Sequence, residues 1–141
     1  MTLLTTRQAI NLRLLEVFAK KGGHAYRTAQ NGQEAVEVYE IAAKQERSED
    51  NDVQSKLAIK PEVVFMDINM PVMDGFEAAR SIRRFEIASG CPRAMIVAVT
   101  GLGDASAQEE AFASGMDMFL TKPVKMKEMT AMLAKIREAG A

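Results

Sequence analysis

Three polar residues of the chain, Asp67, Thr100 and Lys122, each come at the end of a short apolar run. The run before Asp67, residues 63–66, consists of Val, Val, Phe and Met, which predicts a strand buried on both faces. Because the carboxyl ends of parallel strands meet at one edge of an open α/β sheet, the three side chains are expected to converge there. Each alone has a simpler explanation, as a turn cap, a strand-end hydroxyl or a surface lysine.

The three residue types together suit a phosphoryl group. A carboxylate such as that of Asp67 can attack phosphorus to form an acyl phosphate. The Thr100 hydroxyl can donate to a phosphoryl oxygen, and the Lys122 ammonium can neutralise the charge that develops. Pro123 restricts the residue before it and so helps to aim the Lys122 side chain. The sequence therefore predicts a phosphoryl-accepting site at the carboxyl edge of the sheet.

The elements that must position these residues alternate between strand and helix, which is the pattern of a parallel sheet with crossover helices. Strands are expected at residues 2–5, 25–29, 63–66, 94–99 and 118–120. Helices are expected at residues 9–20, after a cap at Asn31, and at residues 75–86, 106–114 and 125–139. Asp74 precedes one of these helices and is interpreted as its cap. Residues 1–141 are expected to form one domain, with residues 44–60 as a polar insertion loop.

Composition narrows the function classes. The formal net charge of −1 argues against binding nucleic acid through bulk electrostatics. The single cysteine, Cys91, excludes an intrachain disulfide framework and fits a reducing compartment. The chain contains no apolar run of membrane-spanning length and no signal-peptide pattern at its N-terminus. We therefore expect a soluble, cytoplasmic protein that is a monomer or a weak dimer and binds neither nucleic acid nor membrane.

Several motifs carry a family resemblance. MDINMPVMDG at residues 66–75, VTG at 99–101 and FLTKPV at 119–124 resemble the receiver domains of two-component response regulators. INLRLL at 10–15, NGQEAV at 31–36 and AFASG at 111–115 are most similar to receivers at the C-terminal ends of fungal hybrid histidine kinases. The resemblance covers nearly the whole chain outside the polar loop.

The resemblance implies a flavodoxin-like (βα)5 fold, a three-layer sandwich with a five-stranded parallel sheet of order 2-1-3-4-5. It implies that Asp67 accepts a phosphoryl group from a phosphohistidine of a histidine-containing phosphotransfer protein or a histidine kinase. In that family Thr100 reports the phosphate by reorienting, Phe119 moves with it, and Lys122 pairs with the phosphate. Such an isolated domain assists its own phosphotransfer and is not an independent enzyme. Mg²⁺ is the family's cofactor, with Asp67 and the backbone carbonyl of Asn69 among its ligands.

The start of the chain departs from the family pattern. Receivers normally end their first strand with two adjacent acidic residues that hold Mg²⁺. Here Thr6 and Arg7 occupy those positions. A hard cation needs several oxygen ligands, and a guanidinium beside Asp67 competes with it. We therefore expect weak or absent Mg²⁺ binding.

The departure leaves three explanations open for the site. Arg7 could pair with Asp67 in place of the metal, which makes the site inert or fixes it in an active-like state. Arg7 could instead turn to solvent, so that Asp67 is phosphorylated slowly without metal. The third explanation is a truncated or altered N-terminus on an otherwise unchanged domain.

Two other function classes remain beside the phosphorelay receiver. One is an atypical pseudo-receiver that acts as a phosphorylation-independent interaction module because Thr6 and Arg7 replace the acidic pair. The other is a hydrolase with an aspartyl-phosphate intermediate, similar to haloacid dehalogenase-type phosphatases. Enzymes of that class use a second acidic residue, two positions after the nucleophile, as the general acid. This chain has Asn69 at that position.

Overall fold

The strands of the chain form one parallel sheet. A computed structural model describes residues 2–5, 20, 26–46, 63–68, 72–101, 105–121 and 125–140. Within these residues the strands are β1 (Thr2–Thr5), β2 (Tyr26–Ala29), β3 (Val63–Asp67), β4 (Met95–Thr100) and β5 (Met118–Thr121). They lie in the order β2-β1-β3-β4-β5, and every neighbouring pair is parallel. The expected flavodoxin-like order is confirmed.

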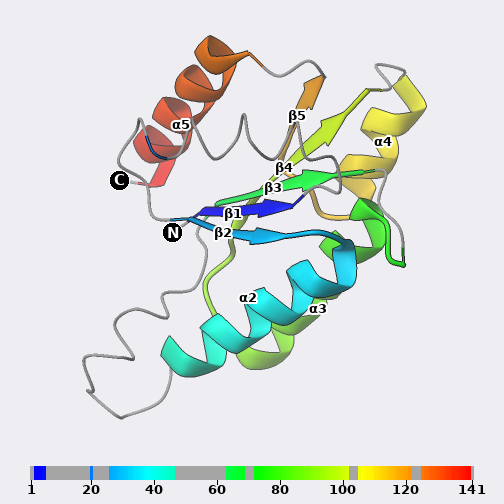
Figure 1. The fold of residues 1–141 in the computed structure, drawn as a ribbon, viewed down its shortest axis with the longest axis vertical. Helices are drawn as coiled ribbons and strands as arrows, with labels where there is room; N and C mark the ends of the chain where they lie inside the picture. Colours follow the sequence, from blue (N-terminus) through cyan, green and yellow to red (C-terminus); the bar gives the residue numbers. More distant parts are fainter. Residues whose placement is uncertain are drawn as a thin grey trace.

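Helices cover both faces of this sheet. They are α2 (Gly32–Glu46), α3 (Gly75–Ser89), α4 (Ala105–Ala113) and α5 (Met126–Gly140). Figure 1 shows α2 and α3 on one face and α5 on the opposite face. The helix expected at residues 9–20 lies outside the described residues except for Lys20, which is helical. None of the helices in the described part of the chain is both long and apolar enough to cross a bilayer.

The alternation of side chains along β3 divides the core between the two faces. Val64 and Met66 pack in a cluster with buried residues of α2 and α3, together with Ala111 of α4. Val63 and Phe65 pack in a second cluster that includes Met129 of α5. Successive residues of a strand point to opposite faces, so a strand buried on both sides reads as a continuous apolar run. The resulting three layers confirm the expected sandwich.

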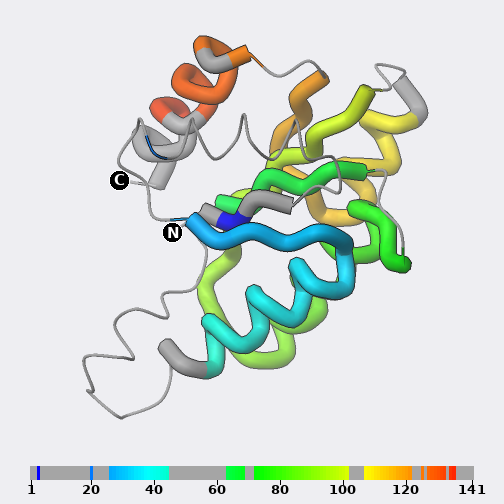
Figure 2. The backbone as a smooth tube through the Cα atoms, in the orientation of Figure 1, coloured from blue at the N-terminus to red at the C-terminus, as the bar shows by residue number. Residues whose placement is uncertain are grey.

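Polar residues determine where α2 begins and how far it runs. The Asn31 side chain accepts a hydrogen bond from the backbone N–H of Glu34 at 2.8 Å, which confirms the expected cap. At its other end α2 continues to Glu46, so residues 44–46 are helical and not part of a loop. Lys, Gln and Glu have good helix propensity, which favours continuation of the helix through these residues. Residues 47–60 of the expected loop lie outside the described residues, as the backbone trace in Figure 2 indicates.

Candidate functional site

Asp67 is the last residue of β3 and is almost completely buried, with 1% of its surface exposed. It is aligned with Val99 of β4, and the next backbone N–H, of Ile68, donates to the Val99 carbonyl at 3.1 Å. From β1 the chain continues outward to β2 on one side of the sheet, and from β3 it continues outward to β4 and β5 on the other side. The strand order therefore reverses between β1 and β3, and Asp67 ends β3 at this topological switch point. Open α/β sheets bind their ligands in the crevice at that point.

Thr100 ends the neighbouring strand β4 and is fully buried. It follows Val99, the partner of Asp67, so the structure brings Asp67 and Thr100 to the same edge of adjacent strands. The arrowheads of β3 and β4 point to this edge in Figure 1. Thr100 is aligned with Thr121 of β5, and Lys122 comes next in the chain but lies outside the described residues.

Phe119 lies on the same face of the sheet as Thr100. It is aligned with Ala98, which is two residues before Thr100 and therefore points to the same side. The Phe119 ring is partly buried and packs against the cluster that contains Ala98 and Met66. The Phe119 ring and the Thr100 side chain therefore lie on the same face of the sheet, two positions apart along neighbouring strands.

The start of α3 is packed closely against Asp67. The backbone N–H of Gly75 donates to the Ile68 carbonyl at 2.9 Å. A Cβ atom added at Gly75 would lie 2.5 Å from the carbonyl oxygen of Asp67. Asp74 caps the helix by accepting from the Glu77 backbone N–H at 2.9 Å, which confirms its expected role. The absent side chain of Gly75 thus allows the helix to approach the carboxyl end of β3.

Gly75→Ala is expected to lower the free energy of unfolding by about 1–3 kcal/mol, because the added methyl group overpacks backbone that cannot move freely. Urea unfolding of both proteins measures this difference. Gly101→Ala is the matched control, since a Cβ at Gly101 meets no atom within 4 Å. Equal losses in the two variants would contradict the close approach described for Gly75.

The loop between β3 and α3 is anchored on α2. The backbone N–H of Gly32 donates to the Met73 carbonyl at 3.1 Å, and a Cβ at Gly32 would lie 2.3 Å from that oxygen. Val72, one residue earlier, has φ of +70° and is 77% exposed. Gly32, Gly75 and Val72 were not among the site residues predicted from the sequence. The glycine of the Asp74-Gly75 pair was the only sequence signal for these features. The positive φ of Val72 could not be predicted, because valine gives no indication of that conformation.

Carboxylates do not gather around Asp67 within the described residues. In that part of the chain there is no group of three or more His, Cys, Asp or Glu side chains that could hold a metal ion. Thr6, Arg7 and Asn69 lie outside the described residues. Mg²⁺ takes near-octahedral oxygen coordination and is usually held by more than one carboxylate or phosphate. Within the described residues Asp67 is the carboxylate at the end of β3, and the other positions that the family resemblance gives to Mg²⁺ ligands lie outside them.

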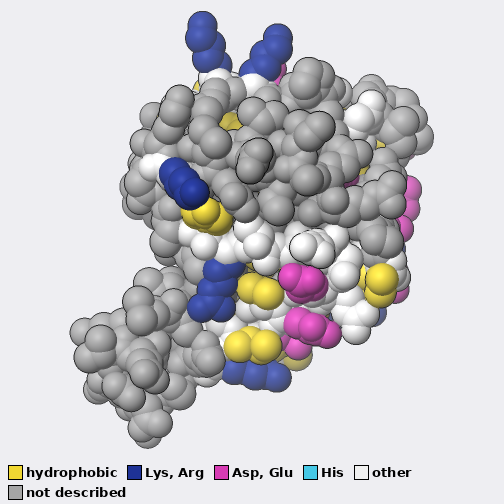
Figure 3. Space-filling view, viewed as in Figure 1, with side chains coloured by type: hydrophobic (Ala, Val, Ile, Leu, Met, Phe, Trp, Pro, Cys, Tyr) yellow, Lys and Arg dark blue, Asp and Glu magenta, His cyan; other side chains and the backbone are white. Residues whose placement is uncertain are grey.

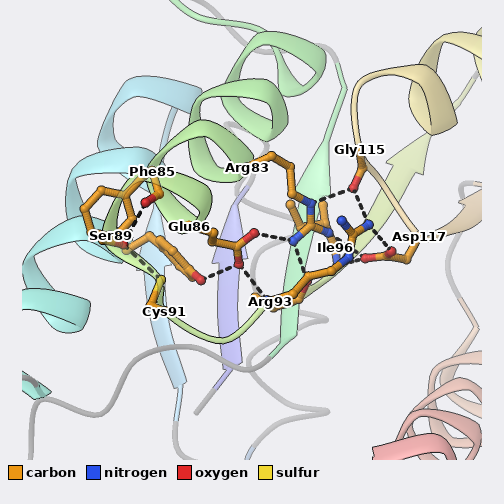
Figure 4. Close-up of polar contacts among 11 residues, drawn as sticks. Arg83, Phe85, Glu86, Ser89, Cys91, Arg93, Ile96, Gly115 and Asp117 are labelled. Atoms are coloured by element: carbon orange, nitrogen blue, oxygen red, sulfur yellow. Dashed lines mark hydrogen bonds and ion pairs between the residues drawn. The ribbon is translucent and has the colours of Figure 1, made fainter.

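A second polar cluster lies at the opposite edge of the sheet, before β4 and β5, and is shown in Figure 4. Arg83 of α3 is its centre, with 11% of the side chain exposed. Its Nη1 donates to Glu86 and to the Ala94 carbonyl, both at 2.7 Å. Its Nη2 donates to Asp117 at 2.6 Å, and its Nε donates to the Gly115 carbonyl at 2.8 Å. One guanidinium therefore joins α3 to the segments that enter β4 and β5.

Glu86 extends this cluster to α2. Its carboxylate accepts from the Tyr39 hydroxyl at 2.6 Å and from the Ala94 backbone N–H at 2.7 Å. Burial, followed by the hydrogen bond to Glu86, raises the pKa of Tyr39 well above its usual value. Tyr39 therefore stays a neutral donor, and the cluster connects α2 and α3 to the starts of β4 and β5.

The fold and the site together define a flavodoxin-like α/β domain with a buried aspartate at its switch point. Residues 7–134 match the response regulator receiver domain. The chain belongs to the response regulator receiver domain family, the receiver class of two-component phosphorelays.

Known relatives support the assignment. The response regulator SSK1 of Arthrobotrys oligospora is 30% identical and is matched over 98% of this chain, which spans 14% of that protein's length. The solved complex of the Saccharomyces cerevisiae histidine phosphotransfer signaling protein Ypd1 with the receiver domain of its downstream response regulator Ssk1 contains a similar chain. That chain has a TM-score of 0.75 and 30% identity, and the match covers 92% of this chain and 82% of the other.

The receiver domain of the histidine kinase CKI1 from Arabidopsis thaliana, solved with Mg²⁺ and BeF3⁻, is also similar. It has a TM-score of 0.81 and 28% identity, with coverage of 97% of this chain and 89% of the other. The relatives thus include the receiver of a histidine kinase, the kind of receiver that the sequence motifs indicated, and also the response regulator SSK1. The Mg²⁺ in that structure is bound to the CKI1 receiver domain, which is a relative of this chain.

Proposed function

We propose that Asp67 accepts a phosphoryl group from a phosphohistidine. The observation that carries the proposal is the buried carboxylate of Asp67 beside Thr100 at the carboxyl edge of a receiver-family sheet. In the transfer, one Asp67 carboxylate oxygen forms a bond to phosphorus. The bond from phosphorus to the donor's imidazole nitrogen breaks, and the nitrogen keeps the electron pair. The product is an acyl phosphate on Asp67.

The other site residues act on the charge of the phosphoryl group. The Thr100 hydroxyl donates to a phosphoryl oxygen, and the Lys122 ammonium neutralises charge as it develops. Phe119 shares a face with Thr100 and follows its movement, which passes the phosphorylation state to the region of β5. In this proposal the domain is a phosphoacceptor and not an independent enzyme.

The phosphodonor is a histidine-containing phosphotransfer protein or a histidine kinase. The solved complex of Ypd1 with the Ssk1 receiver supports a donor of the first kind. Nucleic acid is not a proposed partner, since the net charge is −1, and Figure 3 shows both acidic and basic side chains among the described residues of the face that it displays. We place the protein in the cytoplasm, as a monomer or a weak dimer.

Labelling with a phosphorylated donor tests the proposal. Ypd1 carrying a radioactive phosphoryl group on its histidine is mixed with the protein, and acetyl phosphate serves as a small-molecule donor. Borohydride reduction followed by mass spectrometry locates the acyl phosphate, because the reduced aspartate becomes homoserine. We expect homoserine at position 67. No label from either donor on folded protein would overturn the proposal.

A second candidate function is a pseudo-receiver that binds its partner without phosphorylation. Thr6 and Arg7, in place of the usual acidic pair, favour it. This candidate predicts that Ypd1 binds the unmodified protein and Asp67→Asn equally well, with no label on either. The label at position 67 therefore separates the two functions.

We propose that Mg²⁺ binds weakly or not at all. The sequence offers Thr6 and Arg7 where relatives have acids, and within the described residues no carboxylate cluster compensates. Introducing Thr6→Asp with Arg7→Asp supplies two carboxylates and removes the competing guanidinium, so Mg²⁺ binding is expected to appear.

Thermal unfolding with and without MgCl2 measures this gain. A dissociation constant of about 1 mM would stabilise the double variant by about 1.4 kcal/mol in about 10 mM MgCl2, and the unmodified protein should show no shift. Adding Asp67→Asn to the double variant is the control and should reduce the gain. A strong Mg²⁺ response of the unmodified protein would contradict this proposal.

A further inference from the structure

Val72 is held in a backbone conformation that branched residues rarely adopt. Its φ is +70°, in the left-handed region, where the Cβ of an L-residue crowds the backbone. Among the described residues Val72 is the only non-glycine residue with positive φ. Val has two groups on Cβ, which makes it less suited to this conformation than Gly or Asn. The chain therefore keeps an unfavourable residue at this position.

Packing inside the protein gives little compensation for this strain. The side chain is 77% exposed, so most of its apolar surface meets solvent. The residues that follow Val72 are anchored: the Met73 carbonyl accepts from Gly32, and Asp74 caps α3. The anchors hold the loop in place while Val72 projects outward. Backbone strain of this kind clusters at active sites, ligand clamps and switch regions.

The position of Val72 relates it to the acceptor carboxylate. The loop that carries it leaves β3 after Asp67 and returns at Gly75, whose backbone N–H is bonded to the Ile68 carbonyl at 2.9 Å. Asp67 is only 1% exposed, so a donor imidazole must enter at this edge to reach it. Reacting atoms must come within about 3–3.5 Å of each other. A protein that brings its histidine this close covers the carboxyl end of β3, and the chain leads from there to Val72 five residues later.

We infer that Val72 is an apolar contact for the phosphohistidine-bearing donor protein, held outward by the anchored loop. The inference rests on the proposed function, since it names a specificity-determining residue for the same transfer. The donor surface that fits is apolar and lies beside the donor histidine. Val72 acts on recognition of the protein donor and does not touch the reacting atoms, so a small donor such as acetyl phosphate does not need it.

Val72→Gly tests this role, because Gly accepts positive φ and removes the side chain. The rate of transfer from phosphorylated Ypd1 is expected to fall at least about tenfold, mainly through a higher KM, as for loss of an interface anchor. Labelling by acetyl phosphate should stay within about twofold, and the Tm should be unchanged or higher. Ile87→Ala, at a side chain that is 84% exposed on α3, is the matched control and should change neither rate.

Other outcomes overturn the inference. An unchanged rate from phosphorylated Ypd1 means that the donor does not use Val72. A parallel loss of acetyl phosphate labelling means that the substitution alters Asp67 and not recognition. Titration of unphosphorylated Ypd1 tests the contact without any transfer, and Val72→Gly should weaken binding at least about tenfold. Equal binding by both proteins would overturn the inference, whereas binding without label would overturn only the proposed phosphotransfer.

Discussion

Asp67→Asn is expected to abolish labelling by both phosphorylated Ypd1 and acetyl phosphate. The amide has nearly the shape of the carboxylate, so the buried position at the end of β3 stays filled. It has no anionic oxygen to attack phosphorus and cannot form the acyl phosphate. The measurement is radioactive label per mole of folded protein, with folding checked by circular dichroism. The expected result is label at background level.

Asp74→Asn provides the matched control for this loss. Asp74 lies in the same loop, is also an aspartate, and caps α3 through the Glu77 backbone N–H. Asn is an equally good cap, so the helix start should be kept. We expect label at the level of the unmodified protein. Persistent label in Asp67→Asn would show that another residue accepts the phosphoryl group.

Arg83→Met is expected to give the largest loss of stability, about 3–5 kcal/mol in the free energy of unfolding. Met matches the length of the arginine stem and removes the guanidinium. Glu86, with 5% of its side chain exposed, and Asp117, with 20% exposed, then keep charges in a poorly solvated region without this partner. The Gly115 and Ala94 carbonyls also lose their donor. Urea unfolding with an unchanged m-value is the measurement.

Arg80→Met is the control for the loss of a positive charge on α3. Arg80 is exposed on the same helix, and a surface substitution there should change stability by at most about 0.5 kcal/mol. Arg93→Met should also cost little, because the Arg93 side chain is 60% exposed although it contacts Asp117 at 2.6 Å. A loss below about 1 kcal/mol for Arg83→Met would contradict the central role of this guanidinium.

Local sequence patterns predicted most of the sheet and its helices. The apolar run at residues 63–66 was long enough to indicate burial on both faces, and β3 is buried along its whole length. Asn31 and Asp74 marked helix starts because a short polar side chain that can reach a free backbone N–H is a local property. The end of α2 was less accurate, since the polar residues 44–46 suit both a solvated loop and an exposed helix end.

Contacts between residues far apart in the chain could not be predicted from these local patterns. Arg83, Glu86 and Asp117 look like ordinary surface charges in the sequence, yet the tertiary structure buries Arg83 and Glu86 and joins Arg83 to Asp117, 34 residues further along the chain. The close approach of Gly75 to the Asp67 carbonyl depends on how α3 docks on β3. The positive φ of Val72 depends on both ends of its loop being anchored. None of these follows from spacing alone.

The amino-acid sequence by itself determined the order of strands and helices, the residue types suited to phosphoryl acceptance, and the departure at Thr6 and Arg7. These properties depend on residues that are close together in the chain. The spacing of apolar residues and the residues that cap helices therefore indicate them directly. Only the tertiary structure decided that Asp67 is aligned with Val99, the residue before Thr100, and that Val72 is exposed with a positive φ. The physical reason is that strand pairing and helix docking join residues far apart in the chain, where their relative positions depend on the packing of the whole core.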